Sequence, residues 1–357
     1  MHFFKITAIS LSLCLLSINT LASEVYIQST NFYDSEAVPF SKIEKDWAHH
    51  YRPGTRGITY QWHETGVKYK FWGLGFFQKK QTYLKFHEET ALAVHTIGGK
   101  LPINNDEYRI ELTAKYYNTY GLRLFHTPIH NDKLQITLGM SLIYGEELTD
   151  GTLKGGLTAL SDKDYEFNDI RLNYYYSEDK LFDHDAARPV GEGYSFDTEI
   201  NWRVNSEVKL RFVGRDMGGK IDWFDAPKTV AVVESDNKTV DENGYTKVDP
   251  TLSGNQRTEN FTQQLAPFFA LRSEFGNRQD SILSLQLEHY YIKDYQKLGW
   301  GKILPLNVFA ELVYELQTRA AGFNLKHKYA YLSFMSDHYD LYRSHVLTLS
   351  LGIHYQF

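Results

Sequence analysis

Leu347-Thr-Leu-Ser-Leu-Gly-Ile-His-Tyr-Gln-Phe357, the final stretch of this chain, alternates strictly between apolar and small or polar side chains. Successive side chains of a β-strand point to opposite faces, so this stretch predicts a strand with one apolar face. The apolar row ends in two aromatic residues, Tyr355 and Phe357, and reaches the last residue of the chain. A soluble sheet would rarely run such a strand to its end, because chain ends usually fray.

In this ending the chain resembles bacterial outer-membrane β-barrel proteins, a broad porin-like class. The closing strand of such proteins carries alternating apolar residues, an aromatic residue two before the end and a terminal Phe. Leu351, Ile353, Tyr355 and Phe357 stand at the matching positions. The resemblance implies that these residues form a membrane-insertion signal read by the barrel assembly machinery. It also implies a place in the outer membrane of a Gram-negative bacterium, among lipid and lipopolysaccharide, and it names no substrate.

The other end of the chain predicts a signal peptide over residues 1–22. Lys5 precedes an apolar run over 6–18, and Thr20-Leu-Ala22 supplies a small-residue cleavage site. The run is too short for a transmembrane helix, which needs about 20 apolar residues. Cys14 is the only cysteine and lies inside this run. We therefore expect a mature chain with no disulfide, no thiolate metal site and no cofactor.

The alternation recurs along most of the chain, in runs of about 9 to 13 residues. Strands of soluble sheets average about 5 to 6 residues, whereas a tilted strand needs about 9 to 11 to cross a membrane. We therefore predict an all-β fold, an antiparallel transmembrane β-barrel of about 14 strands, with 12 to 16 possible. The stronger candidates are 108–116, 134–144, 170–176, 194–204, 208–212, 283–291, 306–316 and 347–357; the weaker ones are 55–63, 66–77, 81–97, 121–128, 151–160, 260–272 and 323–335.

Three segments lie outside this simple pattern. Residues 23–54 lack a clear period and are expected to be a periplasmic lead-in, a lumen plug or one further strand, followed by the barrel over 55–357. Residues 217–259 form the longest predicted connection, an extracellular loop with β structure of its own. Its acidic charge and the basic row that precedes it suggest that it folds inward and narrows the lumen. Residues 145–150 are expected to form a shorter outer turn, and Pro267 predicts a bulge or an edge within the strand at 260–272.

Charged residues follow the polar faces of the predicted strands. A charge on the lipid side near the middle of the membrane would cost about 2–4 kcal/mol, so these side chains should point into the lumen. There they either line an open pore or pair with one another in a closed interior. The predicted lumen-facing charges are Arg109, Glu111, Lys115, Asp169, Arg171, Glu199, Arg203, Lys209, Arg211, Glu288, Glu311 and Glu315.

The composition narrows the functional classes. The chain has 44 Asp and Glu against 38 Lys and Arg, a net charge of −6, which argues against a nucleic-acid partner. The usual hydrolase and phosphate-binding motifs are absent from the sequence. Ser206-Glu-Val-Lys209 matches Ser-x-x-Lys at a predicted turn, and His289 is a lone interfacial histidine. We expect a passive channel for small polar solutes with no catalytic residues. An outer-membrane hydrolase of lipid or peptide, and a non-conducting barrel that serves export or a surface organelle, remain as alternatives.

Overall fold

The computed structural model describes residues 23–43, 50–98, 106–160, 165–179, 181–182, 186–240, 246–277 and 281–357. The predicted signal peptide at 1–22 lies outside them. Within these ranges no helix is long and apolar enough to cross a membrane. The strands are β1 (Glu24–Ser35), β2 (Arg56–Tyr69), β3 (Trp72–Phe86), β4 (Asp106–His130), β5 (Leu134–Ala159), β6 (Tyr165–Tyr176), β7 (Val190–Arg203), β8 (Val208–Val240), β9 (Thr246–Gln264), β10 (Phe268–Asn277), β11 (Ser281–Tyr290), β12 (Lys293–Leu304), β13 (Val308–Glu315), β14 (Ala321–Lys326), β15 (Ala330–Ser336) and β16 (Val346–Gln356).

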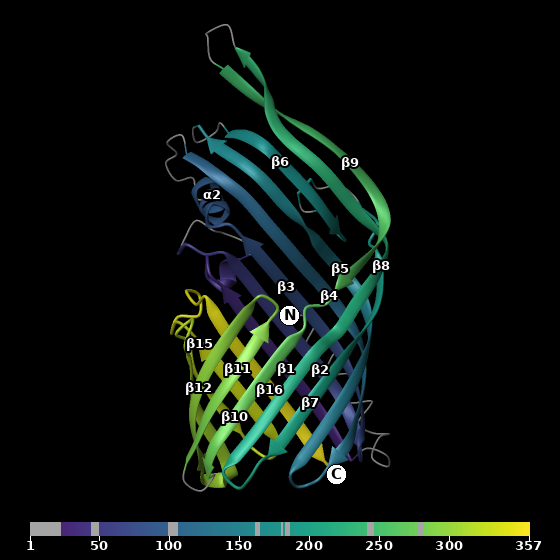
Figure 1. Cartoon of the computed structure of the whole chain (residues 1–357), viewed down its shortest axis with the longest axis vertical. Coiled ribbons are helices and arrows are strands. Elements are labelled where there is room, and N and C mark those ends of the chain that lie inside the picture. Colours follow the sequence, from purple (N-terminus) through teal and green to yellow (C-terminus); the bar gives the residue numbers. More distant parts are fainter. Residues whose placement is uncertain are drawn as a thin grey trace.

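Fourteen of these strands form a closed antiparallel cylinder. The ring runs from β1 to β5 in chain order, continues through β7, β8 and β10, and then follows β11 to β16. β16 pairs with β1 from Val346–Asp34 to Gln356–Glu24 and closes it. The predicted barrel and its strand number are therefore confirmed. Figure 1 shows the cylinder in the lower half of the molecule, with the C-terminus at its base.

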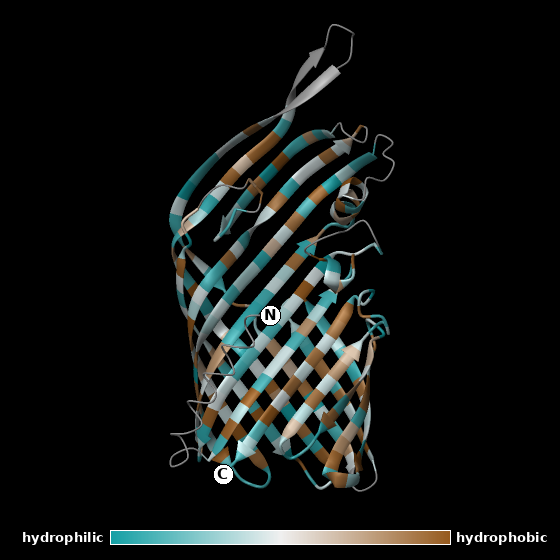
Figure 2. Ribbon diagram, turned by 180° about the vertical axis from the view of Figure 1, so that it is seen from behind, coloured by the Kyte–Doolittle hydropathy of each residue, from teal (hydrophilic) through white to brown (hydrophobic). Residues whose placement is uncertain are grey.

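The cylinder exposes apolar side chains on its outer face. Leu138 is 52% exposed, Leu283 59% and Leu312 64%. The alternate positions point inward, and Figure 2 shows hydrophobic and hydrophilic residues alternating along the strands. Exposed rows of this kind are unfavourable in water and favourable against lipid tails. The architecture is that of the outer-membrane β-barrel class.

Residues 24–35 are part of the barrel wall. Of the three possibilities that the sequence left open for 23–54, this stretch is the further strand, and the lead-in and plug interpretations are wrong for it. β1 makes main-chain ladders with β16 on one side and β2 on the other. Its period is visible once the partners are known, because Tyr26, Phe32 and Asp34 are buried in the interior. The short helix η1 (Phe40–Lys42) follows β1 at the end of the barrel opposite the C-terminus, which we call the outer end.

Residues 217–240 and 246–259 belong to two long strands, β8 and β9, instead of a loop. β8 continues beyond the cylinder, where it pairs with β6 on one edge and β9 on the other. The hairpin projects away from the barrel in Figure 1, so the predicted inward fold is wrong. Its backbone groups are satisfied by the sheet, which leaves no need to fold into the lumen. Only its lower part, with Ile221 and Trp223, packs into the interior.

The sequence also predicts a turn at 145–150 and a strand at 81–97, and both predictions are wrong. Residues 145–150 are no turn: β5 runs through them against β4, and the register shifts between Asn118 and Thr119, opposite Glu147 and Gly145. This bulge absorbs Glu146, whose polar neighbours resembled a turn. The second failure concerns 81–97, which is β3 followed by the helix α2 (Glu88–Gly98). At Pro267, where the sequence predicts a bulge or an edge within one strand, the structure has two strands: β9 ends at Gln264 and β10 begins at Phe268.

α2 covers part of β4 where that strand extends past β3. Glu89 Oε2 accepts from the backbone N–H of Arg109 at 2.6 Å, and Thr90 Oγ1 accepts from that of Glu111 at 2.8 Å. Two donors on the free edge of β4 are thereby satisfied without a partner strand. The wall from β4 to β9 is taller than the wall from β10 to β16, as Figure 1 shows, because it contains the longest strands.

Candidate functional site: the barrel interior and its outer mouth

Aromatic side chains fill the upper part of the cylinder. Phe32 stacks on Tyr290 at a centroid distance of 4.4 Å, although β1 and β11 are not neighbours in the wall. Trp62 stacks on Phe77 at 4.9 Å, and Phe268 lies 4.5 Å from Tyr290. These rings belong to one buried cluster that also includes Trp223. Contacts between strands on different sides of the ring can form only across the lumen, so side chains close the interior at this level.

The ring of Trp223 fits because two glycines face it. A Cβ atom at Gly145 would lie 2.5 Å from the indole, and one at Gly191 would lie 2.7 Å from it. Trp223 Nε1 donates to Gln263 Oε1 at 3.3 Å, and Gln263 donates to Asp150 at 3.2 Å. The indole is thus anchored at both its flat face and its polar edge.

A network of charges lies among these rings. Arg123 Nε donates to Asp197 Oδ2 at 2.6 Å, and its NH1 lies 3.5 Å from Glu64 Oε1. Arg215 NH1 donates to the same Asp197 oxygen at 3.2 Å, and its guanidinium lies over the Trp62 ring at 5.6 Å. Tyr26 donates to Glu64 at 2.6 Å. Buried charges are tolerated only when paired in this way, because each would otherwise lose its hydration without compensation.

Lys79 and Asp216 form a second cross-lumen pair. Nζ of Lys79, on β3, lies 2.5 Å from Oδ2 of Asp216, on β8, and both side chains are buried. Asp216 has φ +56°, a conformation that Asp and Asn adopt more readily than most other residues. Its backbone N–H donates to Asp197 at 3.2 Å, which joins this pair to the Arg123 network. We call Glu64, Lys79, Arg123, Asp197, Arg215 and Asp216 the central layer.

A separate network lies on the β10–β14 side of the interior. Arg272 NH2 donates to Glu311 Oε1 at 2.7 Å, and Asn324 donates to the other oxygen of Glu311 at 2.7 Å. Lys297 donates to Glu288 at 2.7 Å. The charges of this wall are therefore paired as well.

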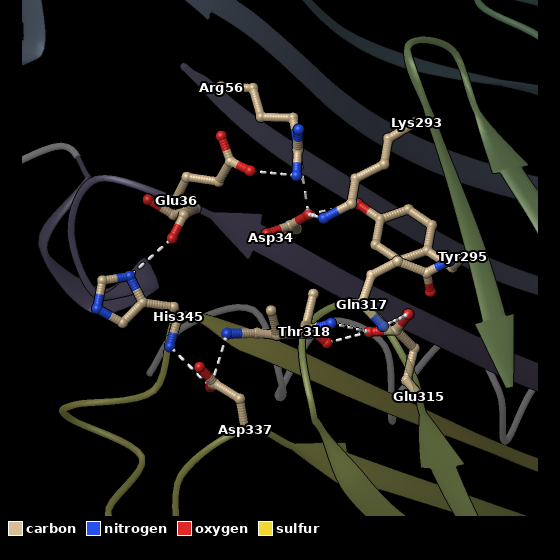
Figure 3. A network of polar contacts seen from close by, with 12 residues as sticks. Asp34, Glu36, Arg56, Lys293, Tyr295, Glu315, Gln317, Thr318, Asp337 and His345 are labelled. Atoms are coloured by element: carbon tan, nitrogen blue, oxygen red, sulfur yellow. Dashed lines mark hydrogen bonds and ion pairs between the residues drawn. The ribbon is translucent and has the colours of Figure 1, made fainter. Parts of the chain in front are cut away.

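A recess of about 540 Å³ lies above the aromatic cluster, at the outer end of the barrel. Figure 3 shows the polar network around it. Its lining comes from the ends of β1, β2, β12 and β13 and from the connections beside them. The lining residues are Asp34, Glu36, Arg52, Pro53, Arg56, Lys293, Gln317, Thr318 and Arg319.

Both acidic residues of the recess are already neutralised. Asp34 Oδ2 accepts from Lys293 at 2.9 Å and from the Tyr295 hydroxyl at 2.5 Å. Glu36 pairs with Arg56 through one oxygen, and its other oxygen accepts from the N–H and hydroxyl of Thr55, each at 3.0 Å. Each carboxylate therefore has a cation and at least one further donor.

Two arginines of the recess have no carboxylate partner among the described residues. Arg52 donates through Nε to the backbone carbonyl of Glu36 at 2.8 Å, and no ion pair is recorded for Arg319. Arg56 Nε is a buried donor without a hydrogen-bond acceptor, and Asp34 Oδ2 lies 3.8 Å from it. The recess therefore carries surplus positive charge and unused donors.

The predicted lumen charges fall into three groups. Glu199, Arg211, Glu288, Glu311 and Glu315 lie in the cylinder with polar partners, as in the Arg211–Glu199 pair at 3.0 Å. Lys115 lies over the Tyr291 ring at 5.5 Å, Lys209 stands opposite Glu274 in the β8–β10 register, and Arg203 is exposed at the base. Arg109, Glu111, Asp169 and Arg171 lie in the extension above the cylinder, in the exposed pairs Arg109–Glu111 and Arg171–Asp169.

None of the six residues of the central layer is among the predicted lumen-facing charges. Asp197 stood in a polar strand row and Arg215 in the basic row before 217–259, but neither was selected as a site residue. Glu64 and Lys79 fell just beyond the bounds of weak strand candidates. The available signal was a charged residue two positions after an aromatic one on the same face of a strand, as in Trp62-His-Glu64 and Phe77-Gln-Lys79. A wider strand window would have found it.

The remaining candidates have plain structural roles. Ser206 lies in the turn between β7 and β8, and Lys209 follows at the start of β8. His289 contacts Asp294 at 2.7 Å on the exposed surface. Leu351, Ile353, Tyr355 and Phe357 all point outward from the wall. The described residues hold no group of three or more His, Cys, Asp or Glu side chains arranged for a metal ion.

No protein-family model matches the sequence, and no curated protein matches it. The fold is similar to that of solved barrels. The P. putida toluene transporter TodX has 7% identity and a TM-score of 0.44, over 94% of this chain and 90% of that one. The monoaromatic hydrocarbon channel CymD has 7% identity and a TM-score of 0.43, over 95% and 90%. The β-domain of the Bordetella autotransporter BrkA has 8% identity and a TM-score of 0.29, over 94% and 100%.

Proposed function

We propose that the protein is an outer-membrane channel of a Gram-negative bacterium, closed in the conformation described, that admits small anionic solutes from the outer side. One observation carries this proposal: a charged recess at the outer mouth lies directly above a lumen closed by side chains. The terminal row Leu351, Ile353, Tyr355 and Phe357 would direct its assembly into a membrane of lipid and lipopolysaccharide.

Closure by side chains allows opening without loss of the fold. Trp62, Phe77 and Lys79 project from strands whose main-chain ladders are continuous. Asp216 projects from a bulge of β8, where the β7–β8 register shifts. Rotation of such side chains leaves every ladder hydrogen bond in place, and rotamer changes are fast compared with unfolding. A solute that competes for the cations of the central layer would break its ion pairs and widen the lumen.

The charge of the recess selects the class of solute. Asp34 and Glu36 are satisfied, whereas Arg52 and Arg319 have no carboxylate partner among the described residues. A carboxylate or phosphate group would supply the anionic partner that these arginines lack, because the planar guanidinium can donate two hydrogen bonds to either group. The volume of the recess suits a small organic anion.

Single-channel conductance in planar bilayers tests the proposal. In the double variant Lys79→Ala with Asp216→Asn, the pair is removed together, because removing one partner alone would leave a buried unpaired charge at a cost of about 3–5 kcal/mol. Asn preserves the positive φ of position 216. We expect wild-type protein to conduct weakly and the double variant to conduct several-fold more.

Neighbouring residues of β3 supply a matched control. Phe77→Ala removes a buried ring from the lumen, while Phe76→Ala removes a ring of the same size that is 50% exposed on the outer face. Phe77→Ala should raise conductance and Phe76→Ala should leave it unchanged. If correctly inserted wild-type, double-variant and Phe77→Ala proteins all fail to conduct, the channel is rejected in favour of a structural barrel.

A further inference from the structure

Three polar side chains interrupt the apolar outer wall at β1 and β2. Ser29, Asn31 and His63 point outward, since Tyr26, Phe32 and Glu64, on the opposite face of the same strands, are buried in the interior. Ser29 pairs in register with Leu351, the middle residue of the outward row of β16, and with His63. On β3, Phe76 is 50% exposed on the same face. The polar group therefore lies within the apolar belt.

The geometry of this group is that of a nucleophile with a base. Ser29 Oγ lies 2.9 Å from His63 Nδ1, and Asn31 Nδ2 donates to Ser29 Oγ at 3.2 Å. Because Asn31 supplies a donor to Oγ, the hydroxyl hydrogen is directed to the imidazole nitrogen. A neutral His63 then carries its own proton on Nε2 and accepts the serine proton through Nδ1.

A purely structural explanation fits the position poorly. Polar and ionisable side chains on the lipid side of a barrel are costly, and within membranes they usually mark functional sites. The polar row continues above this group, where Gln61 donates to the Tyr33 hydroxyl at 2.6 Å. We call Tyr33, Gln61, Asn31, Ser29 and His63 the polar track. It connects the outer rim with Ser29, and it offers water a path along the wall.

We propose that Ser29 and His63 form a catalytic site, open to the membrane, that cleaves carboxylic esters of lipids. Ser29 Oγ adds to the ester carbonyl carbon while His63 Nδ1 takes the hydroxyl proton. The bond from that carbon to the lipid alcohol oxygen breaks, and the alcohol leaves with the proton from His63. His63 then takes a proton from water, and the resulting hydroxide adds to the acyl carbon. The bond from that carbon to Ser29 Oγ breaks, the fatty acid leaves, and His63 returns the proton to Oγ.

Asn31 acts as a positioning residue in this scheme. Its amide already lies within hydrogen-bond distance of Oγ, so it is placed to hold the nucleophile and to donate to the oxyanion that forms beside it. The activity is separate from conduction, because the polar track faces outward and the central layer faces inward.

Two measurements on the full-length protein in mixed micelles test the site. Release of fatty acid from phosphatidylethanolamine reports turnover, and covalent labelling by a fluorophosphonate reports an activated serine. Wild-type protein should give both signals. Ser29→Ala should abolish both signals, and His63→Asn should reduce turnover by at least about 100-fold. Asn31→Ala should lower kcat and leave KM nearly unchanged. Thr65→Ala, another outward residue of β2, is the matched control and should behave as wild type.

Folded wild-type protein that neither releases fatty acid nor reacts with the fluorophosphonate would overturn the proposal. Turnover that survives Ser29→Ala would also overturn it, because the activity would then arise elsewhere. Heat-modifiable migration on gels checks that each variant is folded. Conductance is measured independently, so loss of the lipid-ester site leaves the channel proposal untouched, and the reverse also holds.

Discussion

Leu138 lies on the outward face of β5, while its neighbour Thr137 points inward and pairs in register with Glu199. The side chain of residue 138 therefore faces lipid, and that of residue 137 faces the lumen. Arginine at 138 would place a charge against lipid and cost about 2–4 kcal/mol. Arginine at 137 would gain a carboxylate neighbour and should be tolerated. We expect Leu138→Arg to lower, and Thr137→Arg to preserve, the urea midpoint of the protein refolded into vesicles. Equal midpoints would contradict the outward placement of Leu138.

At the scale of an element, the connection between β15 and β16 carries a pH-sensitive contact. His345 Nδ1 donates to the Ser35 carbonyl at 2.8 Å, and Asp337 Oδ1 accepts from the backbone N–H of His345 and Val346. Burial, aided by Arg52, lowers the pKa of His345, against opposing effects of Ser35, Asp337 and Asp34. The folded loop thus favours neutral imidazole. The stabilisation that this contact gives the folded loop is complete above the pKa of histidine in the unfolded chain, about 6.5, and is lost as the pH falls below that value.

Limited proteolysis at pH 7.5 and pH 5 measures this effect. Cleavage between residues 337 and 345 should become several-fold faster in acid for wild-type protein. His345→Gln, which keeps a side-chain donor and cannot gain a charge, should show the same rate at both pH values. His338→Gln, in the same connection, is the control and should keep the acid dependence. An unchanged wild-type rate would refute the role of His345.

The elements also show what the sequence could determine. Strands with an unbroken two-residue period, such as β16, were predicted correctly because each face of such a strand contacts a single environment, the outside of the barrel or its interior. β8 and β9 are interpreted from the sequence as a loop, because the run Val230-Ala-Val-Val233 does not alternate; in the fold Ala231 is buried against β6. The central layer escaped for a different reason. Lys79 and Asp216 are brought together only by barrel closure, and no local pattern encodes which residues will meet across a lumen.

At the scale of the whole molecule, barrel closure brings two distant connections to the same mouth. Arg52 lies between β1 and β2, Arg319 lies between β13 and β14, and both line the recess. Field lines from surplus charge concentrate at such an opening and raise the local anion concentration. In the Lys79→Ala, Asp216→Asn background, Arg52→Glu with Arg319→Glu should therefore shift the reversal potential, measured across a KCl gradient, toward cation selectivity. Arg343→Glu, an exposed loop change outside the recess, should leave it unchanged. The same shift from Arg343→Glu would show that general surface charge, and not the recess, sets the preference.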